Sequence, residues 1–225
     1  MPNKQNDPGF GEGRELLLEG TRYLGLTLSQ KQIDSFSSYL SLLLTWNSRF
    51  NLTSIKSPTR IIRLHFIDSL AIAPFISPSG RLMDVGSGAG FPGIPLKIIA
   101  PKKEVILVEP QRKKANFMRE VIRSLNLVGM EVVEERAEKI DTHKIGLFSE
   151  VVTRALGSPD LFLRISFPLL STGGQSLIMH GPTGAGLFGS KKMKCPNVRF
   201  SECRLEHYGL PIGGEKRTLL IYVKK

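Results

Sequence analysis

The glycine-rich segment Asp84–Gly93 (Asp-Val-Gly-Ser-Gly-Ala-Gly-Phe-Pro-Gly) carries the densest chemical signal of this 225-residue chain. It lies where a short apolar strand is followed by a helix. Glycines at such a junction allow a tight turn and let the backbone approach a ligand closely. The helix that follows presents unpaired N–H groups to the same place. The segment therefore predicts a nucleotide-like cofactor.

Two registers of this segment predict different cofactors. The spacing Gly-x-Gly-x-x-Gly occurs at Gly88, Gly90 and Gly93, and it predicts NAD. The spacing Asp-x-Gly-x-Gly-x-Gly begins at Asp84 instead. A carboxylate there repels a pyrophosphate but suits the ammonium and sulfonium charges of S-adenosyl-L-methionine. We favour S-adenosyl-L-methionine and keep an NAD-dependent oxidoreductase as the alternative. The cofactor-binding candidates in this segment are Asp84, Gly86, Gly88 and Gly90.

Two further strand ends add acidic candidates. Glu109 ends the next strand, where a carboxylate can accept hydrogen bonds from both ribose hydroxyls in either cofactor class. The following strand runs into Glu134–Glu138. Because ligands of doubly wound sheets lie beside the carboxyl ends of strands, Ala137 and Glu138 are adenine-binding candidates. A solvated charge run explains Glu134–Glu138 equally well.

Arg154 follows the fourth strand, at the exit that faces the transferred group. Its guanidinium suits the carboxylate of the cofactor, a phosphate or the edge of a guanine. A surface arginine is the alternative. Asn/Asp-Pro-Pro-aromatic motifs of amine methyltransferases are missing here, and so is a nearby cysteine nucleophile. We therefore expect no obligatory catalytic residue, with Arg154 as an orienting candidate.

Strands that alternate with helices must position these residues. We expect strands at 81–85, 104–109, 130–134, 150–153 and 176–179, with helices at 92–100, 111–125 and 161–170. This alternation predicts a doubly wound, mostly parallel α/β sheet with helices on both faces. Two strand-like runs, 198–208 and 218–223, predict a closing antiparallel hairpin and bring the sheet to seven strands.

Helices are expected before the sheet. Residues 14–24 suit a short helix, and Ser29 and Gln32 form a capping box ahead of an apolar helix face. Ser57 and Pro58 begin another helix. We expect residues 1–75 to form a helical extension packed on one compact methyltransferase-like unit, residues 76–225. Trp46 follows the apolar face, which favours a place in the core over base stacking.

Composition and charge bound the class of protein. The chain carries 31 Lys and Arg against 20 Asp and Glu, a net charge of +11, which favours a polyanionic partner such as RNA. Its two cysteines, Cys195 and Cys203, fit neither a zinc pattern nor a disulfide framework, so we expect no metal. Residues 1–13 lack the apolar core of a signal peptide, and no apolar stretch has transmembrane length. These features predict a cytoplasmic protein without membrane contact, and nothing demands more than a monomer.

The motifs together resemble one family. Asp84–Leu96 (Asp-Val-Gly-Ser-Gly-Ala-Gly-Phe-Pro-Gly-Ile-Pro-Leu) is similar to the signature of the glucose-inhibited division protein B family, the bacterial small-subunit ribosomal RNA methyltransferases G. The likeness covers residues 30–181. It includes the Trp46–Thr53 and His65–Leu70 motifs, Arg136-Ala137-Glu138 and Thr153-Arg154-Ala155.

The resemblance implies a class I methyltransferase fold that transfers the methyl group of S-adenosyl-L-methionine to N7 of one guanine in small-subunit ribosomal RNA. It implies that Glu109 binds the ribose, and it implies cofactor contacts at Gly86, Phe91, Ala137, Glu138 and Arg154. Guanine N7 has an in-plane lone pair and no proton to lose. Positioning alone can therefore carry much of the rate, which agrees with the missing base. A non-catalytic RNA-binding factor is a further alternative.

Basic runs provide candidates for RNA contacts. Three runs hold several cations with few acids, around Arg60, along 112–123 and at 191–199, which predicts phosphate contacts and binding that weakens with salt. The family usually has Lys-Gly where this chain has His180-Gly181, and histidine would bind phosphate only when protonated. We favour a neutral His180. The RNA-binding candidates are Arg60, Arg63, His180, Lys191, Lys192 and Lys194.

Overall fold

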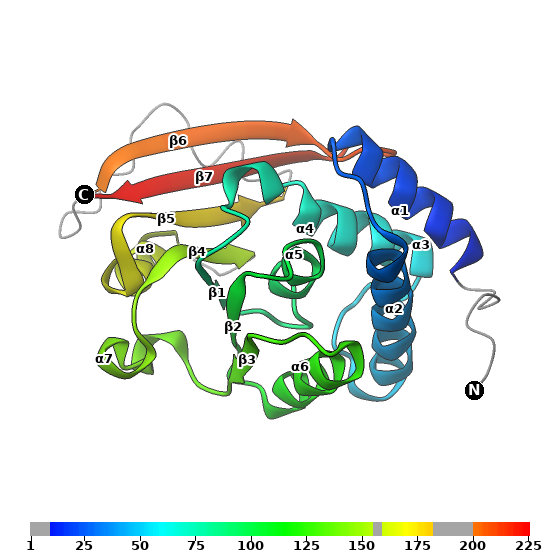
Figure 1. Cartoon of the computed structure of the whole chain (residues 1–225), viewed down its shortest axis with the longest axis horizontal. Helices are drawn as coiled ribbons and strands as arrows, with labels where there is room; N and C mark the ends of the chain where they lie inside the picture. The colour runs from blue at the N-terminus through cyan, green and yellow to red at the C-terminus, as the bar shows by residue number, and fades with distance from the viewer. Residues whose placement is uncertain (1–9, 155–158, 182–199) are drawn as a thin grey trace.

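The computed structural model describes residues 10–154, 159–181 and 200–225. Seven strands form one sheet in the order β3-β2-β1-β4-β5-β7-β6 (Figure 1). Their bounds are β1 Arg81–Val85, β2 Glu104–Val108, β3 Met130–Val133, β4 Phe148–Arg154, β5 Leu170–His180, β6 Phe200–Gly209 and β7 Lys216–Lys224. Strands β1 to β5 run parallel, whereas β7 is antiparallel to both of its neighbours. The sheet and its closing hairpin confirm the predicted topology.

Helical elements precede the sheet and connect its strands. The first group comprises α1 Gly11–Tyr23, α2 Gln30–Phe50, α3 Pro58–Ile61, the π-helical turn η1 Ile62–Ile67, α4 Asp68–Leu70 and the 3-10 turn η2 Ala73–Phe75. The second comprises α5 Gly93–Ile99, α6 Arg112–Leu125, η3 Ala137–Lys139, α7 Thr142–Ile145 and α8 Pro159–Leu169. Within the described ranges, no helix is long and apolar enough to cross a bilayer.

Both faces of the sheet are covered by helices. Successive residues of a strand point to opposite faces. Leu82 of β1 therefore packs into a cluster that includes residues of α1, α2, α5 and α6. Its neighbour Met83 packs into a second cluster with Phe162 of α8. Burial on both faces explains why the parallel strands read as continuous apolar runs.

Helix α2 fastens the N-terminal helices to the sheet. Its capping box is present as predicted, with Ser29 and Gln32 each accepting from the backbone amide of the other. Phe36 and Leu40 on its apolar face lie in the same buried cluster as Leu82 of β1. The helices before the sheet and the sheet itself therefore share one hydrophobic core.

The segment after Ser57 departs from the regular helix that we expected. The Ser57 side chain does cap α3, and Pro58 occupies its first turn. One turn later the chain changes to the π-helical η1, which carries His65, and α4 then begins at Asp68. Such π turns are rare and concentrate at functional sites. Both His65 and Asp68 reach the site described next.

Candidate cofactor and substrate site

The glycine-rich loop after β1 is anchored to β2. The amides of Gly86 and Ser87 both donate to the Val108 carbonyl, over 2.9 and 3.1 Å. Gly90 has a φ of 96°, and a Cβ there would lie 2.3 Å from Ile94 Cδ1 and 2.9 Å from the Tyr39 hydroxyl. Only glycine fits this position, because the backbone conformation and the close approach both exclude a side chain.

Asp84 is fully buried beneath this loop. Its Oδ2 accepts from the Gly93 amide over 2.9 Å, while its Oδ1 has no hydrogen-bond partner among the described residues. Burial raises the pKa of Asp84 to about 7, although the Gly93 amide and the charge of Arg154 oppose that rise. The carboxylate therefore closes the loop with one oxygen and keeps an acceptor for a cationic or hydrogen-bonding group with the other.

Glu109 joins the two loops that follow β1 and β2. Its Oε2 accepts from the Gly88 amide over 2.9 Å, and its Oε1 accepts from the Gln111 amide over 3.0 Å. Each carboxylate oxygen has a second lone pair, so both can still accept a hydroxyl hydrogen. The side chain is thus held in place by backbone donors and remains able to accept from a vicinal diol.

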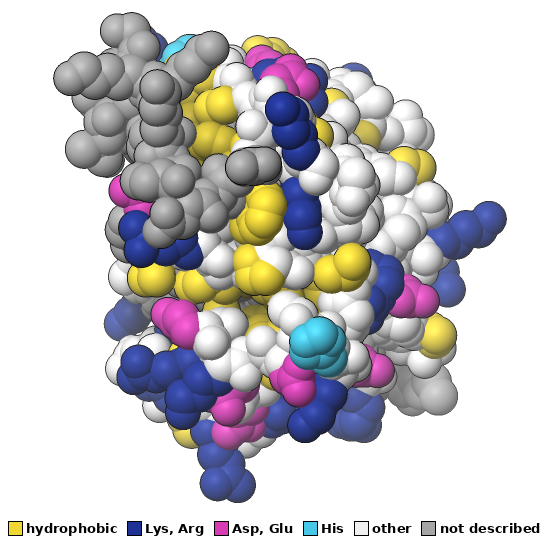
Figure 2. All heavy atoms as spheres, turned by 90° about the vertical axis from the view of Figure 1, so that its left-hand side faces the viewer, with side chains coloured by type: hydrophobic (Ala, Val, Ile, Leu, Met, Phe, Trp, Pro, Cys, Tyr) yellow, Lys and Arg dark blue, Asp and Glu magenta, His cyan; other side chains and the backbone are white. Residues whose placement is uncertain are grey.

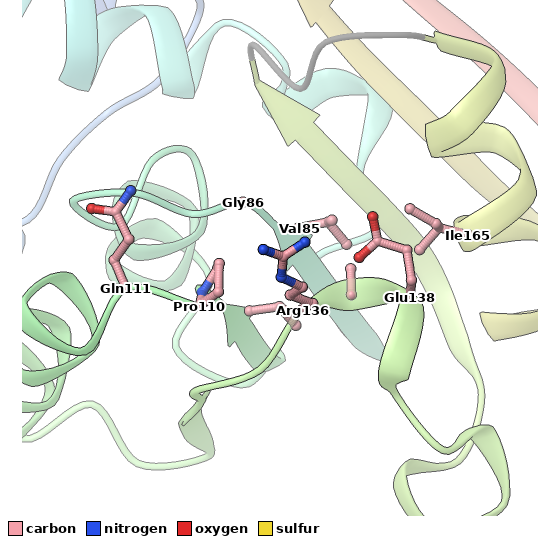
Figure 3. A pocket seen from close by; sticks show the side chains of 9 residues that line it. Val85, Gly86, Pro110, Gln111, Arg136, Glu138 and Ile165 are labelled. Carbon is pink, nitrogen blue, oxygen red and sulfur yellow. The ribbon is translucent and has the colours of Figure 1, made fainter.

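A pocket of about 490 Å³ opens at the exits of β1, β2 and β3. Of the predicted residues, it contains Gly86, Ala137 and Glu138. In Figure 3, Arg136 and Glu138 extend from the segment after β3 toward Val85 and Gly86 of the first exit. The lining residues are Val85, Gly86, Val108, Pro110, Gln111, Arg136, Ala137, Glu138 and Ile165.

Six of the nine lining residues were not candidates from the sequence: Val85, Val108, Pro110, Gln111, Arg136 and Ile165. Val85, Val108 and Pro110 directly adjoin residues that were. Gln111 and Arg136 each lie next to a strand exit that was recognised, so extending both exits by a residue or two would have found them. Ile165 comes from α8 and had no local signal, since only the packing of α8 on the sheet brings it to the pocket.

Arg154 lies at the exit of β4 and outside the residues that line this pocket. Its guanidinium carbon stands over the Phe91 ring, 5.0 Å from the centroid. Nη1 donates to the Leu64 carbonyl over 3.1 Å, and Nη2 lies 3.0 Å from His65 Nδ1. The first exits therefore form a pocket, while the fourth forms a polar cluster against the N-terminal helices.

Asp68 balances the charge of this cluster. Its side chain is 7% exposed, with Oδ1 3.1 Å from Arg217 Nε and Oδ2 3.6 Å from Arg154 Nη1. Burial raises the pKa of Asp68 despite these two guanidinium groups. One carboxylate from α4 thus forms ion pairs with arginines of two strands, β4 and β7.

His65 is the neutral member of the cluster. Its ring stacks on Phe91 with centroids 4.5 Å apart, and its Nε2 lies 3.0 Å from Thr53 Oγ1. Burial and the charge of Arg154 lower the pKa of His65 to about 3. The sequence placed His65 and Asp68 in a family motif but assigned them no role.

Two of the residues predicted to contact RNA, Arg63 and His180, are engaged with or partly buried by other parts of the protein. Arg63 pairs with Glu215 at 2.9 Å and donates to the Ile212 carbonyl, so its guanidinium joins η1 to the β6–β7 turn. His180 is half-buried at the end of β5, and burial lowers its pKa, which supports a neutral imidazole. Arg60 is exposed. The predicted contacts Lys191, Lys192 and Lys194 lie outside the described residues.

The basic run on α6 divides into paired and unpaired cations. Arg119 pairs with Glu134 at 2.8 Å, and Arg123 pairs with Glu120 at 2.7 Å. Among the described residues, no ion pair involves the three cations of the first turn, Arg112, Lys113 and Lys114. On the face shown in Figure 2, basic and acidic side chains intermix. On this face, acidic side chains therefore interrupt the basic ones.

Trp46 lies where the sequence predicted. It is partly buried against the hydrophobic core, and its ring lies 5.6 Å from that of Phe117 on α6. The contact joins α2 to α6 and confirms a packing role.

Comparisons with known proteins agree with this architecture. Among solved structures, a SAM dependent methyltransferase from Aquifex aeolicus has a TM-score of 0.54 at 17% identity, covering 78% of this chain and 97% of that one. TrmN from Thermus thermophilus has a TM-score of 0.53 at 16% identity, covering 71% of this chain and 49% of that one. These likenesses show the class I methyltransferase fold.

Sequence relatives are more specific. The chain is 36% identical over 211 residues to the ribosomal RNA small subunit methyltransferase G of Geotalea uraniireducens, covering 94% of this chain and 96% of that protein. It is 43% identical over 173 residues to the protein of that name from Desulfitobacterium hafniense, covering 76% and 72%. The family model described as GidB, rRNA small subunit methyltransferase G, matches residues 32–207. The chain therefore belongs to the GidB family of small-subunit ribosomal RNA methyltransferases.

Proposed function

We propose that this protein transfers the methyl group of S-adenosyl-L-methionine to N7 of a guanine in small-subunit ribosomal RNA. The observation that carries the proposal is the pocket at the exits of β1 to β3 in a chain of the GidB family. Val85 and Pro110, which line it, are the chain neighbours of the buried carboxylates Asp84 and Glu109. An RNA substrate of this kind also supports the cytoplasmic location expected from the sequence.

The residues present fit S-adenosyl-L-methionine. Asp84 keeps one buried carboxylate oxygen without a partner in the described residues, which suits a cationic ligand group. Glu109 would accept from the ribose hydroxyls, and Ala137 and Glu138 would flank the adenine beside Ile165. Gly86 would let the ligand approach the backbone.

For this reaction, the protein needs to bind and orient the two reactants and needs no general base. When bound, the cofactor supplies an electrophilic methyl group on a sulfonium. The guanine N7 lone pair needs no deprotonation, so no general base is required. His65 is held neutral and hydrogen-bonded, which agrees with a positioning role. Arg154, at the exit of β4, is the residue that we assign to orienting the reacting groups.

The RNA backbone would contact the basic residues that the fold leaves without ion pairs. Arg60 and the first turn of α6, Arg112 to Lys114, are the described candidates. The first turn of α6 follows directly after Pro110 and Gln111, which line the pocket. Phosphate contacts there would orient the RNA without reading its sequence.

Calorimetric titration and a methylation assay test the proposal. The purified protein should bind S-adenosyl-L-methionine saturably and NAD not at all. It should then transfer labelled methyl groups to small-subunit rRNA or subunits, and nucleoside mass spectrometry should find 7-methylguanosine. Binding of NAD alone would overturn the cofactor assignment, and methylation at another guanine atom would overturn the N7 assignment.

A further inference from the structure

We propose that His65 is a positioning residue for methyl transfer, which holds the guanidinium of Arg154 over the ring of Phe91. The inference rests on the proposed function and extends it to a side chain of the N-terminal helices. Neither His65 nor its element, η1, belongs to the strand exits from which the cofactor site was deduced.

Three side chains form a closed triangle of contacts. The His65 ring stacks on Phe91 at an interplanar angle of 23°. The Arg154 guanidinium lies over the same Phe91 ring. His65 Nδ1 and Arg154 Nη2, 3.0 Å apart, complete the triangle. Because Phe91 is part of the glycine-rich loop, the triangle links that loop to the exit of β4.

The chemistry of the two side chains sets the direction of their hydrogen bond. Arginine has five N–H donors and no acceptor, so His65 Nδ1 must present its lone pair. The Leu64 carbonyl also lies 3.1 Å from Nδ1 and accepts from Arg154 Nη1, but an Nδ1–H directed at it would leave the Arg154 Nη2 donor, 3.0 Å away, facing another donor. The ring proton therefore resides on Nε2, where Thr53 Oγ1 lies 3.0 Å away.

The loop after α2 supports this tautomer. The Asn47 side chain accepts from the Thr53 amide over 2.9 Å, which fixes Thr53 beside the imidazole. Burial keeps His65 unprotonated at neutral pH. A protonated ring would offer two donors and could not accept from Arg154.

His65 orients the guanidinium of Arg154 and does not neutralise its charge. The charge of Arg154 is balanced by Asp68, which also pairs with Arg217. Asp68 would still hold Arg154 nearby if the imidazole acceptor were lost. The guanidinium would then lose one of the contacts that fix its orientation. This separation lets a variant change the orientation of Arg154 without removing its counter-ion.

Two substitutions separate the acceptor from the ring. His65→Phe keeps a ring to stack on Phe91 and removes the acceptor. His65→Asn removes the ring and places an amide oxygen close to the position of Nδ1. We expect kcat/KM for rRNA methylation to fall by about tenfold or more in His65→Phe and to recover substantially in His65→Asn. His143→Phe, on the exposed side of α7, is the matched control and should leave activity unchanged.

A second measurement keeps the proposal testable without turnover. In ¹⁵N-labelled protein, NMR should show His65 protonated on Nε2 alone. It should also show an exchange-protected Arg154 Nη2–H signal that His65→Phe loses and His65→Asn retains, while the Nη1–H bonded to the Leu64 carbonyl remains in both. A folded His65→Phe with wild-type kcat/KM, a Nδ1-protonated ring, or a His65→Asn as impaired as His65→Phe overturns this inference alone. A wild-type protein that neither binds S-adenosyl-L-methionine nor methylates rRNA overturns the proposed function as well.

Discussion

The two halves of the candidate site are built over very different distances along the chain. At the exits of β1 and β2, the carboxylates of Asp84 and Glu109 accept from backbone amides 9 and 21 residues away. At the exit of β4, Arg154 contacts His65 across 89 residues, and Asp68 contacts Arg217 across 149. The first half is thus a local motif, and the second is an assembly of distant elements.

The two halves also use opposite chemistry. The local half holds anions with neutral backbone donors, which leaves carboxylate lone pairs for a ligand. The distant half balances two arginines with one buried carboxylate. We therefore expect changes in the local half to act mainly on cofactor affinity, and loss of charge in the distant half to act mainly on stability.

The largest effect should follow from removing the shared carboxylate. Asp68→Asn leaves two largely buried arginines without their counter-ion, so the free energy of unfolding should fall by about 3 kcal/mol. Urea denaturation measures it. Glu202→Gln, in an exposed ion pair with Arg204, is the control and should cost less than about 1 kcal/mol. Equal losses of unfolding free energy in Asp68→Asn and Glu202→Gln would show that the buried carboxylate stabilises the fold no more than an exposed one.

Glu109→Ala tests the local half. It removes the acceptor for two backbone amides and the proposed ribose partner, so the Kd for S-adenosyl-L-methionine should rise by about 100-fold. Calorimetry measures the Kd, and Glu131→Ala, exposed on β3, should leave it unchanged. Glu109→Gln, which keeps one oxygen acceptor, should lie between them. A large loss of stability with unchanged affinity would remove the distinction between the halves.

The pH dependence of stability should report Asp84. Its folded-state pKa of about 7 lies above the value for an unfolded chain, so its stabilising contribution is complete below about pH 4 and is lost as pH rises through 7. The cofactor-free protein should lose about 2 kcal/mol between about pH 5.5 and 7.5. Asp84→Asn should flatten this slope in urea titrations at both pH values. A slope that persists in the variant would assign it to another group.

The smallest effect tests whether the local half depends on the N-terminal helices. The Tyr39 hydroxyl of α2 donates to the Ala89 carbonyl of the glycine-rich loop. Tyr39→Phe removes this one bond, so we expect a stability loss of about 1 kcal/mol and about a fivefold rise in the cofactor Kd. Tyr23→Phe, exposed on α1, serves as the control. An unchanged Kd in a less stable variant would show that the loop holds its shape without α2.

The sequence patterns of single strands and helices predicted most element boundaries, because each pattern lies within a few neighbouring residues. The strand expected at 81–85 is β1 with the same bounds, and the helix expected at 111–125 is α6 within one residue. The strand expected at 176–179 is longer, since β5 runs from Leu170 through Gly173 and Gly174. Two glycines suggest a turn locally, whereas pairing with β4 across an irregular register extends the strand.

The sequence by itself determined the fold class. It also placed the glycine-rich loop, Glu109 and Ala137 after the ends of strands, because each position depends on a strand and its own neighbours. Only the tertiary structure decided that Arg63 pairs with Glu215 and that Ile165 lines the pocket. It also decided that His65 meets Arg154. Contacts of this kind join residues far apart in the chain, and they form only when helices and strands pack around a shared core.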